Sequence, residues 1–154
     1  AIVHDPRRVE AFYHLGRLYG AMGHVDEGYA QIEEAIKTAP NNAHSYYVAA
    51  MYIMRHHKSP REIKKAARHL EKAVSLSPYN ALYHGALGQA YASLGSLMQA
   101  RNSLMESIRL DPGMGPSYRL LRDIFTAMGK HEEAAEINAV LEGIREGRRS
   151  GAGE

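Results

Sequence analysis

The chain has 154 residues, a length that suits one domain with a sizeable buried core. Its formal net charge of +2 is unexceptional, and the absence of cysteine excludes disulfides and thiolate chemistry. No apolar run is long enough to cross a bilayer, and no signal-peptide pattern is present. These features leave the compartment open between cytoplasm and periplasm.

A short phrase that ends in proline recurs along the chain. Its prolines are Pro6, Pro40, Pro78 and Pro112, which stand 34, 38 and 34 residues apart. A fixed period in this range indicates stacked helical hairpins, which are surfaces for holding other molecules. Because the first copy occupies residues 1–6, we expect those residues to be the tail of a preceding repeat and the chain to be a fragment of a longer protein.

Apolar residues at spacings of three and four predict two helices in each repeat. Gly23, Gly95 and Gly129 lie between the helices of a pair, where a helix C-terminus favours positive φ. A proline then closes the pair, because it cannot continue a helix. The expected helices, in chain order, span 8–22, 25–38, 42–57, 60–76, 80–94, 97–109, 115–128 and 131–146.

The first helix of each repeat shares two features. Its fourth position carries a ring, at Phe12, Tyr46, His84 and Tyr118, and its eighth position is small at Gly16, Ala50 and Gly88 but not at Arg122. This pattern resembles the tetratricopeptide repeat family over nearly the whole chain. The resemblance implies an all-α fold, a right-handed superhelical solenoid of stacked antiparallel helix pairs. We expect about four repeats, at 9–42, 43–80, 81–114 and 115–146.

Two repeats depart from the common pattern. The second is four residues longer, with the addition near 55–62, and Ser59-Pro60-Arg61-Glu62 predicts a capped helix that starts one turn early. Ser96 gives a similar cap signal. The fourth repeat lacks the closing proline and is predicted to be terminal, followed by a flexible tail at 147–154.

The residues that carry chemistry give no enzyme signature. No nucleophile elbow, phosphate loop, nucleotide fingerprint or His-Glu-x-x-His motif is present. His56 and His57 are adjacent and lack a third ligand at metal spacing, and an approach of His69 from the following helix would depend on the packing of the helices. We therefore predict a non-enzymatic chain without catalytic residues, metal or other cofactor.

One stretch is strongly basic. Residues 55–72 hold seven basic and two acidic residues. Such a run is usually a solvated helix face, and it is also a candidate landing site for an acidic partner, a phospholipid surface or nucleic acid. Because the stretch lacks aromatic residues that could stack on bases, nucleic acid is disfavoured. The candidate basic-patch residues are Lys58, Arg61, Lys64, Lys65, Arg68 and Lys72.

The resemblance also implies a concave groove lined by the first helix of each repeat. The residues carried over onto this chain are rich in tyrosine, arginine and methionine, which suit interfaces. Some of these rings have an alternative role in packing between neighbouring repeats. The candidate groove residues are Tyr13, His14, Arg17, His44, Tyr47, Met51, Met54, Arg55, Gln89, Arg119 and Asp123.

The leading hypothesis is a protein–protein interaction module that binds a peptide or helix of another protein in this groove and acts as an assembly scaffold. One alternative is a structural spacer within a larger multidomain protein. Another is self-association, as a homo-oligomer that forms through exposed repeat edges. A third is binding of an acidic partner or nucleic acid through residues 55–72. No transmembrane segment is expected in this piece.

Overall fold

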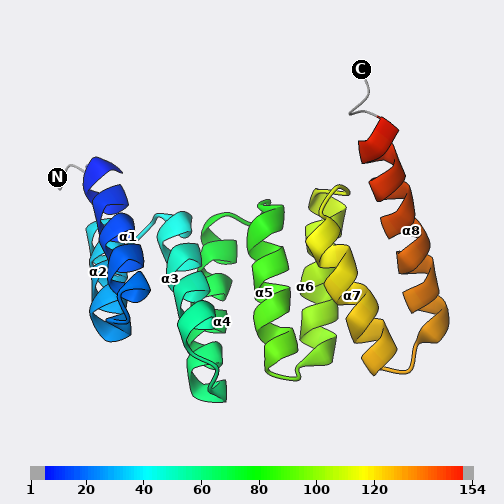
Figure 1. Cartoon of the computed structure of the whole chain (residues 1–154), viewed down its shortest axis with the longest axis horizontal. Coiled ribbons are helices and arrows are strands. Elements are labelled where there is room, and N and C mark those ends of the chain that lie inside the picture. The colour runs from blue at the N-terminus through cyan, green and yellow to red at the C-terminus, as the bar shows by residue number, and fades with distance from the viewer. Residues whose placement is uncertain (1–5, 151–154) are drawn as a thin grey trace. The chain divides into compact units, whose positions relative to one another are not determined.

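A computed structural model describes the backbone of residues 6–150 and the side chains of residues 7–147. Within that range the chain forms eight α-helices and no strand. Figure 1 shows them in order along the chain. The helices are α1 (Pro6–Ala21), α2 (Val25–Thr38), α3 (Ala43–His56), α4 (Pro60–Leu76), α5 (Ala81–Ser93), α6 (Leu97–Leu110), α7 (Gly115–Ala127) and α8 (His131–Ser150).

The helices form two compact units, Ala1–Pro78 and Tyr79–Glu154. In the first unit α1 packs on α2 and α3 on α4, and α2 and α3 join the two hairpins. The second unit repeats the scheme, because α5 packs on α6, α7 on α8, and α6 on α7. Each hairpin is antiparallel because its loop is short. The predicted all-α fold of stacked antiparallel helix pairs is confirmed.

Local signals in the sequence set most helix ends. The backbone N–H of Glu62 donates to Ser59 Oγ (3.3 Å), and Pro60 is the first residue of α4, as the capping sequence predicts. Asn42 and Asn80 cap α3 and α5 by accepting from the backbone N–H groups of His44 and Leu82. Ser96 precedes α6 without a side-chain cap, and its backbone is not in the extended conformation of a typical N-cap.

The core of each unit lies between its helices. In the first unit Ile32, Ile53 and Leu70 are buried together with a set of alanines. In the second unit Ala100, Leu104, Leu121 and Ile124 form one cluster. Small residues at the crossing points allow this packing, because a Cβ at Gly88 would lie only 2.6 Å from Leu104 Cγ. The eighth position of the repeat is therefore small where two helices cross closely.

Gly95 ends α5 in the left-handed region, with φ of +73°, and a Cβ built on it would meet nothing within 4 Å. An alanine side chain would therefore fit in the space at this position, but the positive φ would strain the backbone of any residue other than glycine. We expect Gly95→Ala to reduce the free energy of unfolding by about 1 kcal/mol, measured by thermal unfolding. Gly147→Ala, which also has open space, is the control without positive φ and is expected to cause no loss. Equal losses for both variants would contradict the conformational explanation.

The last helix differs from its prediction. We expected α8 to end at residue 146 and a flexible tail to follow, but the helix continues to Ser150. One glycine inside a helix costs only about 1 kcal/mol, and the charged residues around Gly147 are good helix formers, so no strong stop signal is present. The rest of the predicted tail, 151–154, and residues 1–5 of the predicted preceding repeat lie outside the described residues.

Candidate functional site

Three rings gather on the first helices of the first unit. Tyr13 of α1 meets the His44 ring of α3 edge-on, with centroids 5.7 Å apart. His44 in turn stacks on Tyr47, one helical turn further along α3, at 5.8 Å. Tyr13 and Tyr47 are half-buried, and His44 is exposed. We call Tyr13, His44 and Tyr47 the ring cluster. It is a surface of the kind that aromatic side chains form at protein interfaces.

Hydrogen bonds hold the ring cluster in place. The Tyr13 hydroxyl and the fully buried Ser45 Oγ lie 2.7 Å apart and are hydrogen-bonded, which ties α1 to α3. Asn42 caps α3 next to His44 and so fixes the start of that helix. Burial raises the pKa of the Tyr47 hydroxyl above its ordinary value, so this side chain stays neutral at physiological pH. The cluster is thus an aromatic platform whose tyrosine rings are held in position.

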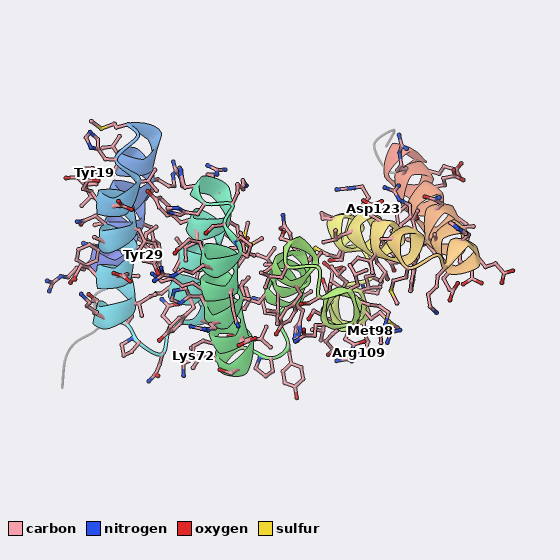
Figure 2. The ribbon with its side chains drawn as sticks, turned by 90° about the horizontal axis from the view of Figure 1, so that it is seen from below. Tyr19, Tyr29, Lys72, Met98, Arg109 and Asp123 are labelled. Carbon is pink, nitrogen blue, oxygen red and sulfur yellow. The ribbon has the colours of Figure 1, made fainter. Side chains whose placement is uncertain are left out.

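Other predicted groove residues of the first unit lie close to the ring cluster along α1 and α3. Arg17 follows Tyr13 by four residues and Met51 follows Tyr47 by four, so each lies one turn further on the same helix side. His14, Arg17 and Arg55 are exposed, and Met51 is half-buried. Within the second unit, Gln89 of α5 and Arg119 and Asp123 of α7 are exposed. Asp123, labelled in Figure 2, accepts from Arg122 Nη2 at 2.7 Å.

Met54 is the exception among the predicted groove residues. Only 8% of its surface is exposed, so it belongs to the buried set of α3. The reason is its register, because Met54 follows the fully buried Ala50 by four residues and therefore lies on the same buried stripe. Met54 is therefore less accessible to a partner than the other predicted groove residues, and its role in the groove stays a prediction.

The predicted basic patch divides into two parts. Arg61, Lys64, Arg68 and Lys72 are exposed, and their spacings of three and four place them on one side of α4. We call these four residues the basic stripe; Figure 2 labels Lys72 at its end. The remaining two are engaged locally. Lys58 Nζ donates to the Met54 carbonyl (2.8 Å), and Lys65 Nζ lies 4.2 Å from the Tyr29 ring centroid and 3.9 Å from Glu33 Oε1.

His69 lies between the two hairpins of the first unit. Its Nε2 and the Tyr29 hydroxyl are hydrogen-bonded at 2.9 Å, with Tyr29 reaching from α2 toward α4 (Figure 2). Burial lowers the pKa of His69, and burial with nearby Glu33 and Glu62 raises the pKa of Tyr29, so both groups are neutral at physiological pH. This pair joins the hairpins.

Among the described side chains, no group of three histidine, cysteine, aspartate or glutamate residues is placed to hold a metal ion. Among the described helices, none combines the length and apolar character needed to cross a membrane.

The prediction from sequence did not include the residue that hydrogen-bonds to the ring cluster. Ser45 was not among the expected site residues, yet it binds Tyr13 directly. The equivalent residue of α7, Ser117, is also buried and hydrogen-bonded, to Ser107 Oγ at 2.8 Å. A serine at the third position of the first helix in two repeats was the available signal.

The paired helices and the small residues at their crossing points define a helical-repeat fold. The family model for the tetratricopeptide repeat matches residues 9–42 and 81–114, which are the ranges predicted for the first and third repeats. Residues 9–42 and 81–114 thus match tetratricopeptide repeats, a family whose members are typically non-enzymatic modules that serve as scaffolds for protein–protein interaction.

Known proteins agree on this fold. The Protein CTR9 homolog of Arabidopsis thaliana is 28% identical over 109 residues, which is 71% of this chain and 10% of that relative. The crystal structure of MamA matches with a TM-score of 0.81 at 21% identity, covering 95% of this chain and 83% of that one. A second MamA structure, MSR-1 C2, matches with a TM-score of 0.74 at 28% identity, covering 90% and 77%. The chain thus spans a tenth of the curated relative and most of the MamA structures.

Proposed function

We propose that the chain binds a helical or extended segment of another protein on the first-helix surface of its first unit. The observation that carries this proposal is the ring cluster, in which Tyr13, His44 and Tyr47 from two helices lie within ring-contact distance. Rigid aromatic side chains supply contact area at low entropic cost, which is why they anchor interfaces. Two of the three rings are held by burial or by the bond to Ser45 before any partner arrives.

The exposed Arg17, one turn after Tyr13 on α1, favours a partner segment with apolar anchors and at least one acidic residue. Arg17 and Arg55 are the exposed charged residues of the predicted groove set in this unit, and both are cationic. An arginine guanidinium can bind a carboxylate with two parallel hydrogen bonds, which adds orientation as well as affinity. Met51 supplies an adaptable apolar contact beside Tyr47. A single groove of this size is expected to bind with modest affinity.

The test selects ligands and then asks which residues they need. A displayed library of random helical and extended peptides is selected on the full chain, and the best peptide is measured by fluorescence anisotropy. We expect His44→Glu and Arg17→Glu each to raise the dissociation constant about tenfold or more. His44→Glu removes a stacked ring, and each variant places a carboxylate where an acidic partner binds. Both side chains are exposed, so neither change should disturb folding, which circular dichroism checks.

The matched control is Arg68→Glu, a charge reversal of the same size on α4. Its affinity for the selected peptide should remain within about twofold of the unchanged chain, since exposed charges distant from a site contribute little. If Arg68→Glu weakens binding as much as His44→Glu and Arg17→Glu do, or if neither of those two variants weakens it, the proposed site is wrong.

Arg68→Glu also tests the second candidate function, which is the binding of an acidic partner on α4. The basic stripe favours it, because four exposed cations share one side of a helix whose opposite side is buried. Three properties of the selected peptides would support this function together. They would be rich in aspartate and glutamate, lose affinity for the Arg68→Glu variant, and bind far more weakly as the salt concentration rises. A spacer function remains the interpretation if no peptide can be selected at all.

A further inference from the structure

The Tyr29–His69 pair lies where the two hairpins of the first unit meet. Tyr29 belongs to α2 and His69 to α4, and their hydrogen bond of 2.9 Å joins residues 40 positions apart in the sequence. The Tyr29 ring also lies near the Tyr52 ring of α3, with centroids 6.3 Å apart. Through Tyr29, α2 therefore contacts both helices of the second hairpin.

Tyrosine rings lie close to the His69 imidazole. This imidazole is half-buried, and its centroid is 6.0 Å from that of the Tyr46 ring of α3. The Tyr46 hydroxyl donates to the Pro40 carbonyl at 2.9 Å, so it is engaged within its own loop. Burial beside neutral rings removes part of the water that would solvate a charged imidazole, and it therefore disfavours the protonated form.

The charges around the pair, taken together, also disfavour a proton on His69. The groups that face it are Tyr29 and Glu33 of α2, Tyr46 of α3, and Glu62 and Lys65 of α4. Lys65 Nζ lies 4.2 Å from the Tyr29 ring centroid and 3.9 Å from Glu33 Oε1, so Glu33 already has a cationic neighbour. Lys65 precedes His69 by four residues, a spacing at which like charges on a helix repel. Burial and then Lys65 lower the pKa of His69, and Glu33 offsets them only in part.

We propose that the Tyr29–His69 pair is an acid-sensitive clasp between the two hairpins of the first unit, closed while His69 is neutral and weakened when His69 takes up a proton. The protonated imidazole carries a hydrogen on both nitrogens, so its Nε2 can no longer accept from the Tyr29 hydroxyl and can only donate to it. The added proton also places a second positive charge near Lys65. Acid therefore loosens the attachment of α2 to α4.

Proton binding sets the direction of the effect. Folding lowers the pKa of His69 below its ordinary value of 6.5. The unfolded chain therefore binds more protons at this residue than the folded chain as the pH falls below that value. The stability that the clasp contributes is fully present above pH 6.5 and is lost progressively below it.

The clasp and the ring cluster span the same two hairpins. Tyr13 of α1 meets His44 of α3 across this junction, just as Tyr29 of α2 meets His69 of α4. When the clasp weakens, the first hairpin is held less firmly against the second, and the contact between Tyr13 and His44 loses support. A loss of partner binding in acid rests on the proposed function, whereas the clasp itself does not, so its test uses no ligand.

The test follows His69 and α2 in the full chain. The His69 imidazole is titrated by NMR, and amide hydrogen exchange gives the protection factors of α2 at about pH 7.5 and about pH 5, each corrected for the intrinsic exchange rate at that pH. Both pH values lie above the ordinary carboxylate pKa, so the acidic residues stay charged. We expect the titration midpoint of His69 to lie below 6.5 and the protection of α2 to be about threefold or more lower at the acidic pH.

His69→Gln separates the proton from the hydrogen bond, because a glutamine amide can bond to the Tyr29 hydroxyl and does not titrate. It should remove most of the acid-induced loss of protection, whereas His14→Gln, at an exposed histidine of α1, is the matched control and should leave that loss unchanged. A midpoint of His69 at or above 6.5, which needs no variant, or an undiminished loss in His69→Gln would overturn the proposal. So would a loss that His56→Gln removes instead, since the histidine whose ring lies 4.4 Å from that of Tyr52 would then be the responsible group.

Discussion

Truncating Leu104 to alanine is expected to remove about 2–5 kcal/mol from the free energy of unfolding of the second unit, because the lost methyl groups leave a cavity that the helices cannot fill. Leu104 is only 1% exposed and packs with Ala100, Leu121 and Ile124 at the junction of two hairpins. The close approach of Gly88 adds rigid backbone on the other side. Urea unfolding followed by circular dichroism measures the change.

The neighbouring residue supplies the control for Leu104. Met105 is 51% exposed on the same helix, so Met105→Ala removes a side chain of similar size without opening a cavity. Its effect should remain within about 0.5 kcal/mol, as for most surface substitutions. Similar losses for both variants would mean that helix propensity, rather than the junction of the hairpins, sets the stability of α6.

Most of the fold could be predicted because residues that start or end helices stand at regular places along this chain. Proline ends each early hairpin, glycine with positive φ separates helices at Gly23, Gly95 and Gly129, and Ser59 with Pro60 starts α4. Each signal acts within a few residues, so the helix bounds follow from the sequence alone. The end of α8 was missed because no comparable signal stands at residue 147, and helix propensity alone sets a frayed boundary.

The site was less predictable because it depends on how one hairpin rests on the next. Helical spacing correctly indicated that Tyr13, His44 and Tyr47 lie on first helices, but it could not give the contact between rings from different repeats. The buried bond from Tyr13 to Ser45 also depends on this packing. The burial of Met54 follows from its spacing of four residues from the buried Ala50, but how far the buried stripe of α3 extends also depends on the helices packed against it.

Replacing Gly28 with alanine is expected to destabilise the first unit by about 3 kcal/mol, because overpacking at a rigid contact forces backbone to move. A Cβ on Gly28 would collide with the Tyr52 hydroxyl and lie 2.7 Å from the Gly16 carbonyl oxygen. That oxygen belongs to the backbone of α1, so it cannot turn away as a side chain would. The collision also strains the bond from Tyr52 to the Val25 carbonyl. Hydrogen exchange of α1 and α2 with urea unfolding measures the loss.

The same substitution at Gly143 isolates this steric cost from helix propensity. Gly143 lies inside α8 and a Cβ there would meet nothing within 4 Å, so Gly143→Ala should stabilise the chain by up to about 1 kcal/mol. The opposite signs arise because both positions gain helix propensity but only Gly28 lies where α1, α2 and Tyr52 converge. If Gly28→Ala were neutral or stabilising, α1 and α2 could separate at little cost, and the close crossing at Gly16 and Gly28 would not hold Tyr52 and the second hairpin in register.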